Sequence, residues 1–285
     1  MTAGGINPPA IGAREMEVLA EKLRREHGFD LLSYKPRLLR RRIQSRLRVR
    51  ECPDLGAYLK LLRADSEELS SLLRTLTIHV SGFFRNEETF EFLRERVFPG
   101  LIRSRWEDGQ ELVLVSAGCA EGEEPYSLAM LLHRHFGREI AGLPRRIIGL
   151  DVDGEVLQRA RRGNYEPERT ADLPSSYRRF FSRKGDRVEV APEIRAEVEF
   201  RRCDLKELVP VAGADLVMCR NVLIYFKRGG QRRILNGLRE ALRPGGLLVL
   251  GKTEALIGEM RSGFRVLDLT EHVYCKAGEE PCGWR

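Results

Sequence analysis

Several polar residues directly follow short apolar runs in the sequence, and their types suit a nucleoside-containing ligand. Leu112–Val115 has the length of a buried strand and leads into a turn of small residues at Gly118, where the backbone can approach a ligand closely. Asp151 ends the next apolar run, where a carboxylate accepts hydrogen bonds from ribose hydroxyls. Asp151 has an alternative role as a helix N-cap, although Asp153 is the better cap candidate. The spacing of Gly118 and Gly122 departs from G-x-G-x-x-G, so a nicotinamide cofactor fits less well than another nucleoside.

Two further polar positions follow strand-like runs in the same way. Asp204 comes after Val198–Phe200, where it suits the exocyclic amine of an adenine ring, with an ordinary loop acid as the alternative. Arg220 and Asn221 come directly after the apolar run Ala214–Cys219. Ligands of doubly wound sheets bind at the carboxyl ends of the strands, so this is the expected ligand edge.

The elements that must position these residues are strands alternating with helices, which predicts a doubly wound α/β sheet. The expected strands are Leu112–Val115, Arg146–Leu150, Ala214–Cys219 and Gly246–Leu250, and the expected helices are Tyr126–Phe136, Gly154–Arg162 and Gln231–Leu242. Phe264–Leu269 and His272–Lys276 are expected to close the sheet as an antiparallel pair. Residues 171–202 interrupt the alternation and are predicted to form a small antiparallel β insertion, with residues 188–190 and 198–200 as strands.

The part of the chain before this sheet is predicted to be a separate all-α domain at residues 14–90, after a flexible leader at residues 1–13. The second domain then spans residues 91–285. A helix beginning at Pro36 carries an apolar stripe at helical spacing, formed by Leu39, Ile43 and Leu47. The residues around that stripe are basic, with no acid among them: Arg37, Arg40, Arg41, Arg42, Arg46, Arg48 and Arg50. Because like charges at i, i+4 repel, we favour a docking surface for an acidic partner over an ordinary solvated face. The docking candidates are Arg37, Arg41, Arg42, Arg46 and Arg48.

The overall composition agrees with an acidic partner without identifying it. The 285 residues include 49 Lys and Arg against 42 Asp and Glu, a formal charge of +7. Nucleic acid, anionic lipid and acidic protein all fit that excess. The six cysteines form no C-x-x-C pair and the histidines do not cluster, so reduced thiols and no metal site are expected. Neither a signal peptide nor an apolar run of membrane-spanning length is seen, and we expect a cytoplasmic protein.

Four short motifs occur together in one order along the chain. They are Phe83-Phe84-Arg85, Gly122-Glu123-Glu124-Pro125-Tyr126-Ser127, Asp151-Val152-Asp153 and Cys219-Arg220-Asn221-Val222-Leu223-Ile224-Tyr225-Phe226. As a set they resemble the CheR family of chemotaxis receptor methyltransferases, over about Leu19 to Lys276. The resemblance implies a Rossmann-like domain that uses S-adenosylmethionine (SAM) as methyl donor and leaves S-adenosylhomocysteine as product. The implied acceptor is a glutamate side chain in the helical cytoplasmic domain of a chemoreceptor, which becomes a methyl ester during chemotaxis adaptation.

The resemblance and the strand-end positions together give a set of candidate site residues. The expected cofactor contacts are His79, Ser81, Arg85, Gly118, Glu124, Asp151, Asp204, Leu205, Arg220, Asn221 and Val222. Arg85 and Tyr225 are expected nearest the transferring methyl group. His79 and Ser81 stand where the family usually has Asn and Thr, and Glu121 replaces a usual Thr, which places an extra acid near the cofactor. Arg183–Val188 is shorter and poorer in glycine than the loop of members that bind a receptor's C-terminal pentapeptide, which implies the pentapeptide-independent kind.

A methyl transfer to a glutamate side chain needs no general acid or base from the protein. The carboxyl group has an ordinary pKa of about 4.3 and is anionic at neutral pH, and the sulfonium methyl is already activated. Arg85 is expected to hold a carboxylate by paired hydrogen bonds and Tyr225 to orient the attack, with purely structural roles as the alternatives. One rival function is a nucleic-acid methyltransferase, although no Asn-Pro-Pro-Tyr-like turn is present. The other is a non-catalytic SAM-binding scaffold. We expect neither nucleic-acid binding nor membrane insertion, and a monomer.

Overall fold

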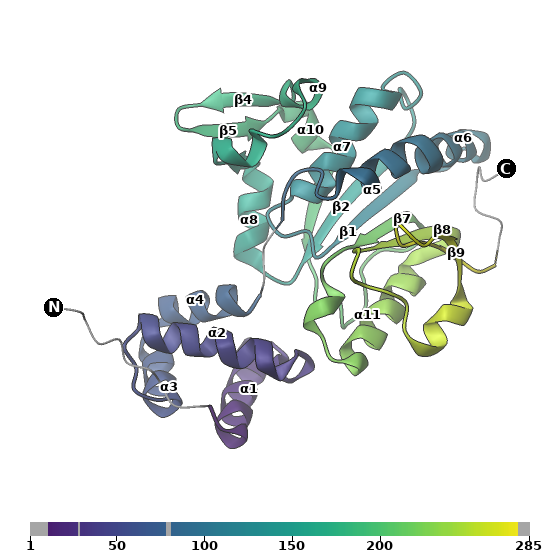
Figure 1. Ribbon diagram of the computed structural model, residues 1–285. Coiled ribbons are helices and arrows are strands. Elements are labelled where there is room, and N and C mark those ends of the chain that lie inside the picture. Colours follow the sequence, from purple (N-terminus) through teal and green to yellow (C-terminus); the bar gives the residue numbers. More distant parts are fainter. Residues whose placement is uncertain (1–10, 28, 78–80, 279–285) are drawn as a thin grey trace. The chain divides into compact units, whose positions relative to one another are not determined.

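The computed structural model describes residues 11–27, 29–77 and 81–278, and it divides into two compact units (Figure 1). The first unit comprises residues 1–78 together with Tyr225–Gln231, and the second comprises residues 79–224 and 232–285. The predicted leader lies mostly outside the described residues. At its end Ile11 is buried, and the first helix begins at Ala13.

The first unit is all-helical, as predicted. Its elements are α1 (Ala13–His27), the 3-10 turn η1 (Leu31–Ser33), α2 (Pro36–Val49), α3 (Leu55–Ala64) and α4 (Ser66–Leu76). Pro36 opens α2 at a position where its missing N–H costs little. Asp54 and Asp65 cap α3 and α4, because each side chain accepts a backbone N–H of the first helical turn. The predicted apolar stripe of α2 is confirmed: Leu39, Ile43 and Leu47 are all buried.

A segment from far along the chain completes this helical unit. Tyr225–Gln231 lies beside η1 and the start of α2, where the Lys35 N–H donates to the Tyr225 carbonyl oxygen at 2.9 Å. The buried Phe226 ring packs against Tyr34 in a tilted arrangement, with a 4.5 Å separation of ring centroids. The core of the helical unit is therefore assembled from two separate stretches of sequence.

The second unit is built on a seven-stranded sheet in the order β6-β2-β1-β7-β8-β10-β9. The strands are β1 (Leu112–Ala117), β2 (Arg145–Asp151), β6 (Val198–Arg202), β7 (Ala214–Cys219), β8 (Leu242–Leu250), β9 (Phe264–Asp268) and β10 (Val273–Lys276). The first five strands in that order are parallel, and β10 runs antiparallel to β8 and β9. All six residues of β1 are buried, so the sheet is covered on both faces, as apolar strand runs predict for parallel sheets.

Helices lie on both sides of this sheet and confirm the doubly wound α/β class. They are α5 (Glu87–Phe92), the π-helical turn η2 (Leu93–Val97), α6 (Phe98–Asp108), α7 (Glu123–Phe136), α8 (Gly154–Arg162) and α11 (Arg228–Ala241). Figure 1 shows α6 and α7 on one side of the sheet and α11 on the other. The shorter elements are η3 (Pro167–Thr170), α9 (Ser175–Arg178), α10 (Pro192–Ala196), η4 (Leu223–Tyr225) and η5 (Gly258–Gly263).

The division between the units differs from the predicted boundary at residue 90. The segment from Phe83 to Phe90 belongs to the second unit, because its aromatic side chains enter the core of that unit. The Phe84 and Phe90 rings pack edge to face with centroids 5.2 Å apart, and Phe84 also packs on Tyr177 at 4.1 Å. Aromatic burial therefore moves the boundary to about residue 78.

The predicted β insertion is present but composed differently. Its three-stranded antiparallel sheet has the order β3-β5-β4, from β3 (Asn164–Tyr165), β4 (Phe181–Lys184) and β5 (Arg187–Val190). The prediction that Val198–Phe200 belongs to it is wrong, because β6 pairs in parallel with β2 at the edge of the main sheet. The alternation of Val198, Glu199 and Phe200 reflects an edge strand with one covered face, since Val198 and Phe200 are buried and Glu199 is exposed.

Candidate cofactor site at the carboxyl edge of the sheet

The predicted polar residues follow four neighbouring strands of the parallel sheet. Asp204 follows β6, Asp151 ends β2, Gly118 follows β1, and Arg220 follows β7. Because these strands are parallel neighbours, their carboxyl ends lie at one edge. The structure therefore brings the strand-end candidates together.

The turn after β1 (residues 118–122, the glycine turn) has backbone conformations that favour glycine. Gly118 has φ +81°, and its N–H donates to the Leu150 carbonyl oxygen at 2.8 Å. A Cβ at Gly118 would lie 2.4 Å from Cγ2 of Val222, so the turn passes very close to the segment after β7. Ala120 has φ +49°, and its N–H donates to Asp151 Oδ2 at 3.0 Å. The close approach requires glycine at position 118.

Asp151 is a buried carboxylate that organises the end of β2. Its Oδ1 accepts the Asp153 N–H at 3.1 Å, in addition to the bond from Ala120 to Oδ2. Asp153 caps α8 by accepting from the N–H groups of Glu155 and Val156, so the cap alternative belongs to Asp153. The Asp151 carboxylate thus lies at the end of β2, beside the turn after β1, where a carboxylate suits the ribose hydroxyls of a nucleoside ligand.

Glu124 and Arg220 form an ion pair that joins three segments of the site. Arg220 Nη1 donates to Glu124 Oε2 at 3.2 Å, and its side chain is only 2% exposed. Its Nη2 donates to the Arg85 carbonyl oxygen at 2.6 Å and to Asn86 Oδ1 at 2.8 Å. Glu124 Oε1 accepts from Ser116 Oγ at 2.8 Å. Arg220 thus fixes the backbone at Arg85 relative to β1, α7 and the end of β7.

Asn221 carries an acceptor that none of the described residues satisfies. It has φ +59°, and its Oδ1 is buried without a hydrogen-bond partner among those residues. The buried Glu254 holds this conformation, since its Oε2 accepts from Asn221 N at 2.7 Å and from Gly251 N at 2.8 Å. Glu254 Oε1 accepts from Ile224 N at 3.2 Å. A buried amide oxygen of this kind suits a ligand donor, because leaving it unsatisfied costs about 1–3 kcal/mol.

Positive φ angles at non-glycine residues also mark this edge. Among the described residues, Phe84, Asn86, Ala120 and Asn221 have φ between 49° and 59° and occupy the three segments just described. Each costs of order 1–3 kcal/mol, and such strain persists where the surroundings over-determine it, commonly at ligand sites. The orphaned amide oxygen, the strained turns and the acceptor-rich edge fit a nucleoside cofactor such as SAM.

The positions of the other predicted site residues do not by themselves assign them a role at this edge. Asp204 accepts from the Lys206 N–H at 3.0 Å and pairs with the Lys206 ammonium at 3.2 Å, while Leu205 is buried beside it. The Arg85 side chain is exposed. His79 lies outside the described residues. Tyr225 belongs to the helical unit, so its predicted place next to the methyl group stays a prediction.

Glu121, the extra acid in the turn after β1, is paired with two arginines. Arg159 Nε donates to Glu121 Oε1 at 2.7 Å, and Arg169 Nη2 donates to Oε2 at 3.2 Å. Both arginines are remote from Glu121 in sequence, so local spacing could not predict these ion pairs. Glu254 was also not predicted as a site residue, although an acid shortly after the predicted strand Gly246–Leu250 could have indicated it.

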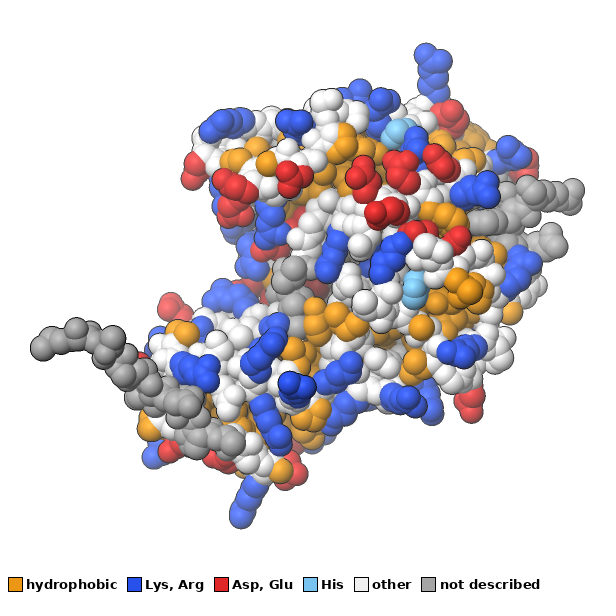
Figure 2. Space-filling model, in the orientation of Figure 1, with side chains coloured by type: hydrophobic (Ala, Val, Ile, Leu, Met, Phe, Trp, Pro, Cys, Tyr) orange, Lys and Arg blue, Asp and Glu red, His pale blue; other side chains and the backbone are white. Residues whose placement is uncertain are grey.

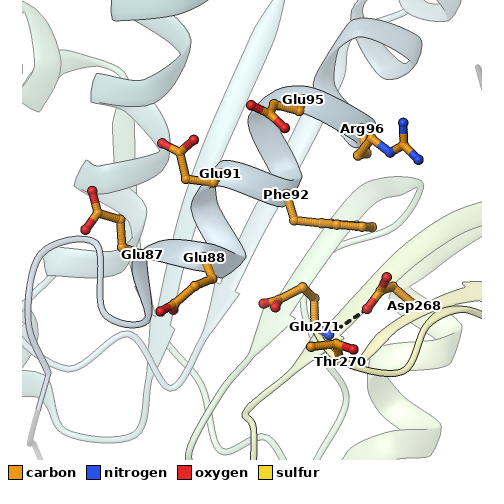
Figure 3. A pocket seen from close by; sticks show the side chains of 9 residues that line it. All are labelled: Glu87, Glu88, Glu91, Phe92, Glu95, Arg96, Asp268, Thr270 and Glu271. Atoms are coloured by element: carbon orange, nitrogen blue, oxygen red, sulfur yellow. Dashed lines mark hydrogen bonds between the residues drawn. The ribbon is translucent and has the colours of Figure 1, made fainter.

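A separate acidic cavity is lined by α5, η2 and residues 268–271. It has a volume of about 680 Å³ and is lined by Glu87, Glu88, Glu91, Phe92, Glu95, Arg96, Asp268, Thr270 and Glu271 (Figure 3). Acidic side chains also gather over α5 on the face seen in Figure 2. None of the candidate cofactor residues lines this cavity.

The basic face of α2 is partly neutralised within the helical unit. Arg46 Nε donates to Glu68 Oε1 at 3.0 Å, and Arg50 Nη2 donates to Asp65 Oδ2 at 2.9 Å. The half-buried Arg42 donates to the Thr75 carbonyl oxygen. The expectation of uncompensated repulsion is therefore wrong for Arg46. The exposed arginines of α2 are Arg37, Arg40, Arg41 and Arg48, and basic side chains spread over this unit in Figure 2.

Replacing Glu68 should destabilise the helical unit. Glu68 is 2% exposed, pairs with Arg46, and accepts from the Tyr58 hydroxyl, whose pKa burial raises. Glu68→Gln removes the buried carboxylate that pairs with the half-buried Arg46 guanidinium and should cost roughly 3 kcal/mol. Native-state hydrogen exchange at the amides of α2 and α4 measures the change. The exposed neighbour Glu67 provides the control, and equal protection in Glu68→Gln and Glu67→Gln would contradict a stabilising role for the pair.

The parallel sheet and the polar residues at its carboxyl edge belong to an α/β fold that binds a nucleoside ligand, and the family match makes this fold a SAM-dependent methyltransferase. Residues 79–273 match the family model described as the CheR methyltransferase SAM-binding domain, and residues 14–77 match the CheR methyltransferase all-alpha domain. The chain belongs to the CheR methyltransferase family, and its cofactor is SAM.

Named relatives agree with this assignment. The chemotaxis protein methyltransferase of Listeria innocua is 35% identical over 248 residues, which is 86% of this chain and 92% of that protein. Chemotaxis protein methyltransferase 1 of Pseudomonas aeruginosa is 34% identical over 251 residues, covering 85% and 90%. An uncharacterised 104.1 kDa protein of Rhodobacter capsulatus is 38% identical over 271 residues, but this chain spans only 28% of its length. No helix among the described residues is both long and apolar enough to cross a membrane.

Proposed function

We propose that this protein transfers the methyl group of SAM to glutamate carboxylates on the cytoplasmic helices of chemoreceptors, forming methyl esters in chemotaxis adaptation. The observation that carries the proposal is Arg85, an exposed arginine on a segment that Arg220 holds at the cofactor edge through the Arg85 carbonyl oxygen. A guanidinium at this place can bind an acceptor carboxylate through paired hydrogen bonds. The names of the relatives support chemotaxis as the setting.

The chemistry asks mainly for positioning. When bound, SAM supplies an activated methyl group on a sulfonium. An acceptor glutamate is already ionised at neutral pH, so this chain's residues need to bind and orient it and exclude water. Asp151 and Asn221 hold the donor side of the site, Arg85 holds the acceptor, and Tyr225 orients the attack. The product S-adenosylhomocysteine then leaves the same edge of the sheet.

The exposed face of α2 supports a docking role toward an acidic helical partner. Arg37, Arg41 and Arg48 are exposed and can steer encounter with acidic receptor helices. The connection between β4 and β5 consists of Gly185 and Asp186, which fits a member that does not use a receptor's C-terminal pentapeptide. We expect the protein to act in the cytoplasm as a monomer.

Labelled-methyl transfer from SAM to a receptor cytoplasmic fragment tests the proposal. The expected product releases methanol in base, as an ester does. Arg85→Ala should lower kcat by roughly a hundredfold, because the acceptor loses its orientation. Label entering DNA or RNA would favour a nucleic-acid methyltransferase, and binding of SAM without transfer to any acceptor would favour a scaffold.

A second pair of variants tests receptor binding separately from methyl transfer. Arg41→Glu should raise the KM for the receptor fragment by about tenfold at low salt, with little change in kcat. Arg63→Glu, an exposed charge reversal on α3 of the same unit, is the matched control. Equal effects of the two variants would argue against a docking face on α2.

A further inference from the structure

One arginine of the β insertion links three segments of the cofactor site. Arg169 Nη1 donates to the Ser81 carbonyl oxygen at 3.0 Å and to Glu123 Oε1 at 2.7 Å. Its Nη2 donates to Glu121 Oε2 at 3.2 Å. A single guanidinium thus joins the segment that leads to Arg85, the glycine turn and the first turn of α7.

That segment lies between two arginine anchors. Residues 81–86 form no helix or strand, and Phe84 and Asn86 have φ of 50° and 58°. Arg169 holds the carbonyl oxygen at its start, and Arg220 holds the carbonyl oxygen of Arg85 near its end. The two arginines pair with neighbouring acids, Glu123 and Glu124 respectively. The strained backbone is thus fastened to α7 on both sides.

The insertion, which carries Arg169, is itself held against the turn after β1. Tyr165 of β3 donates its hydroxyl hydrogen to the Glu121 carbonyl oxygen at 2.6 Å. Arg159 of α8 pairs with the other carboxylate oxygen of Glu121 at 2.7 Å. Arg169 lies on η3, which directly follows β3 and begins at Pro167. The guanidinium is therefore presented from a supported element.

The main acidic partner of Arg169 is an unusual carboxyl group. Glu123 is fully buried, and its Oε2 has no hydrogen-bond partner among the described residues. Burial raises the pKa of Glu123 to about 7, and the nearby Arg169 lowers it only in part. The charged or titratable groups facing it are Arg169, Glu121, the Tyr165 hydroxyl and the Cys119 thiol. The last two have raised pKa values, so they stay neutral near pH 7.

We propose that Arg169 is a positioning residue of the SAM site, which fastens residues 81–86, and Arg85 with them, to the glycine turn. The insertion thereby sets cofactor affinity although it contributes no strand to the main sheet. The inference deepens the proposed function and rests on its SAM site, but not on the identity of the methyl acceptor.

Calorimetric binding of S-adenosylhomocysteine tests the role without any turnover. Arg169→Gln should weaken binding by about tenfold, since it removes charge-assisted hydrogen bonds to two acids and one carbonyl. Arg169→Lys should restore part of the loss. Arg187→Gln is the control, because Arg187 lies in the same insertion but pairs with Asn164 and Glu166. It should bind as the wild type does.

Two readouts separate positioning from general destabilisation. The Phe84 amide, which donates to Ser127 Oγ at 2.9 Å, should exchange its hydrogen faster in Arg169→Gln and not in Arg187→Gln. Wild-type affinity should fall as the pH drops from 8 through about 7 toward 6, because protonated Glu123 loses its charge pairing with Arg169. That dependence should be flattened in Arg169→Gln.

Wild-type affinity and exchange in Arg169→Gln at every pH would overturn the inference, as would equal losses in Arg187→Gln. If Arg169→Gln does not fold, Arg169→Lys decides by the same comparisons. A wild-type protein that binds S-adenosylhomocysteine but methylates no receptor fragment would overturn the proposed acceptor and leave the role of Arg169 standing.

Discussion

Gly118→Ala is expected to weaken binding of SAM and S-adenosylhomocysteine by about tenfold or more, the equivalent of about 1.4 kcal/mol or more. The new Cβ would lie 2.4 Å from Cγ2 of Val222, so the glycine turn or the segment after β7 must move. The φ of +81° adds a strain of about 1–2 kcal/mol for any L side chain. Isothermal titration calorimetry measures the affinity and thermal unfolding measures the stability.

Two comparisons separate the clash from the strain in this prediction. Gly109→Ala introduces the same kind of strain at φ +61° with no atom within 4 Å of the added Cβ, so it should lower stability but not affinity. Adding Val222→Ala to Gly118→Ala removes the clashing methyl group and should restore part of the affinity. Wild-type affinity in the single Gly118→Ala variant would show that the close approach has no part in the cofactor site.

Arg220→Met is expected to abolish tight cofactor binding, with a loss of about a hundredfold, and to destabilise the second unit by about 3–5 kcal/mol. The substitution keeps much of the side-chain volume but leaves Glu124, Asn86 Oδ1 and the Arg85 carbonyl oxygen without their donor. The segment bearing Arg85 then loses its anchor at the edge of the sheet. Calorimetry with S-adenosylhomocysteine and urea unfolding measure the two effects.

The control is Arg243 of β8, a largely buried arginine that pairs with Asp215 at the other end of β7. Arg243 Nε donates to Asp215 Oδ1 at 2.6 Å, and Asp215 Oδ2 accepts from the Val113 N–H at 2.8 Å, at the start of β7 and β1. Arg243→Met should therefore destabilise comparably and leave cofactor affinity unchanged. Equal affinity losses in the two variants would attribute the effect to stability and not to the site.

The strands and their ligand edge were predictable from the sequence because each signal is local. Apolar runs located β1, β2 and β7, and polar residues directly after them located Asp151, Arg220 and the Gly118 turn. Parallel neighbours bring such strand ends together whatever lies between them in the chain. The class of fold and a nucleoside ligand therefore followed from short stretches of sequence, and SAM followed from the family resemblance of four motifs taken together.

The wrong predictions concern residues whose partners are distant in sequence. Glu68, which neutralises Arg46, is 22 residues away, so the i, i+4 spacing within the helix indicated only repulsion. The strand Val198–Phe200 has the alternation of an exposed hairpin, and only its pairing with β2 identifies it as an edge of the main sheet. The roles of Arg169 and Glu254 likewise depend on loops brought together by folding.

Because the helical unit is assembled from two stretches of chain, it cannot be replaced by that of a relative through a single cut. Phe226 packs on Tyr34, yet it follows the Asn221-Val222 segment by only a few residues. Excision of residues 1–78 at one cut would leave Phe226 and the Tyr225 carbonyl oxygen without their partners. A helical unit grafted from a relative would therefore have to bring its own version of Tyr225–Gln231, so the two units cannot be exchanged at a single boundary.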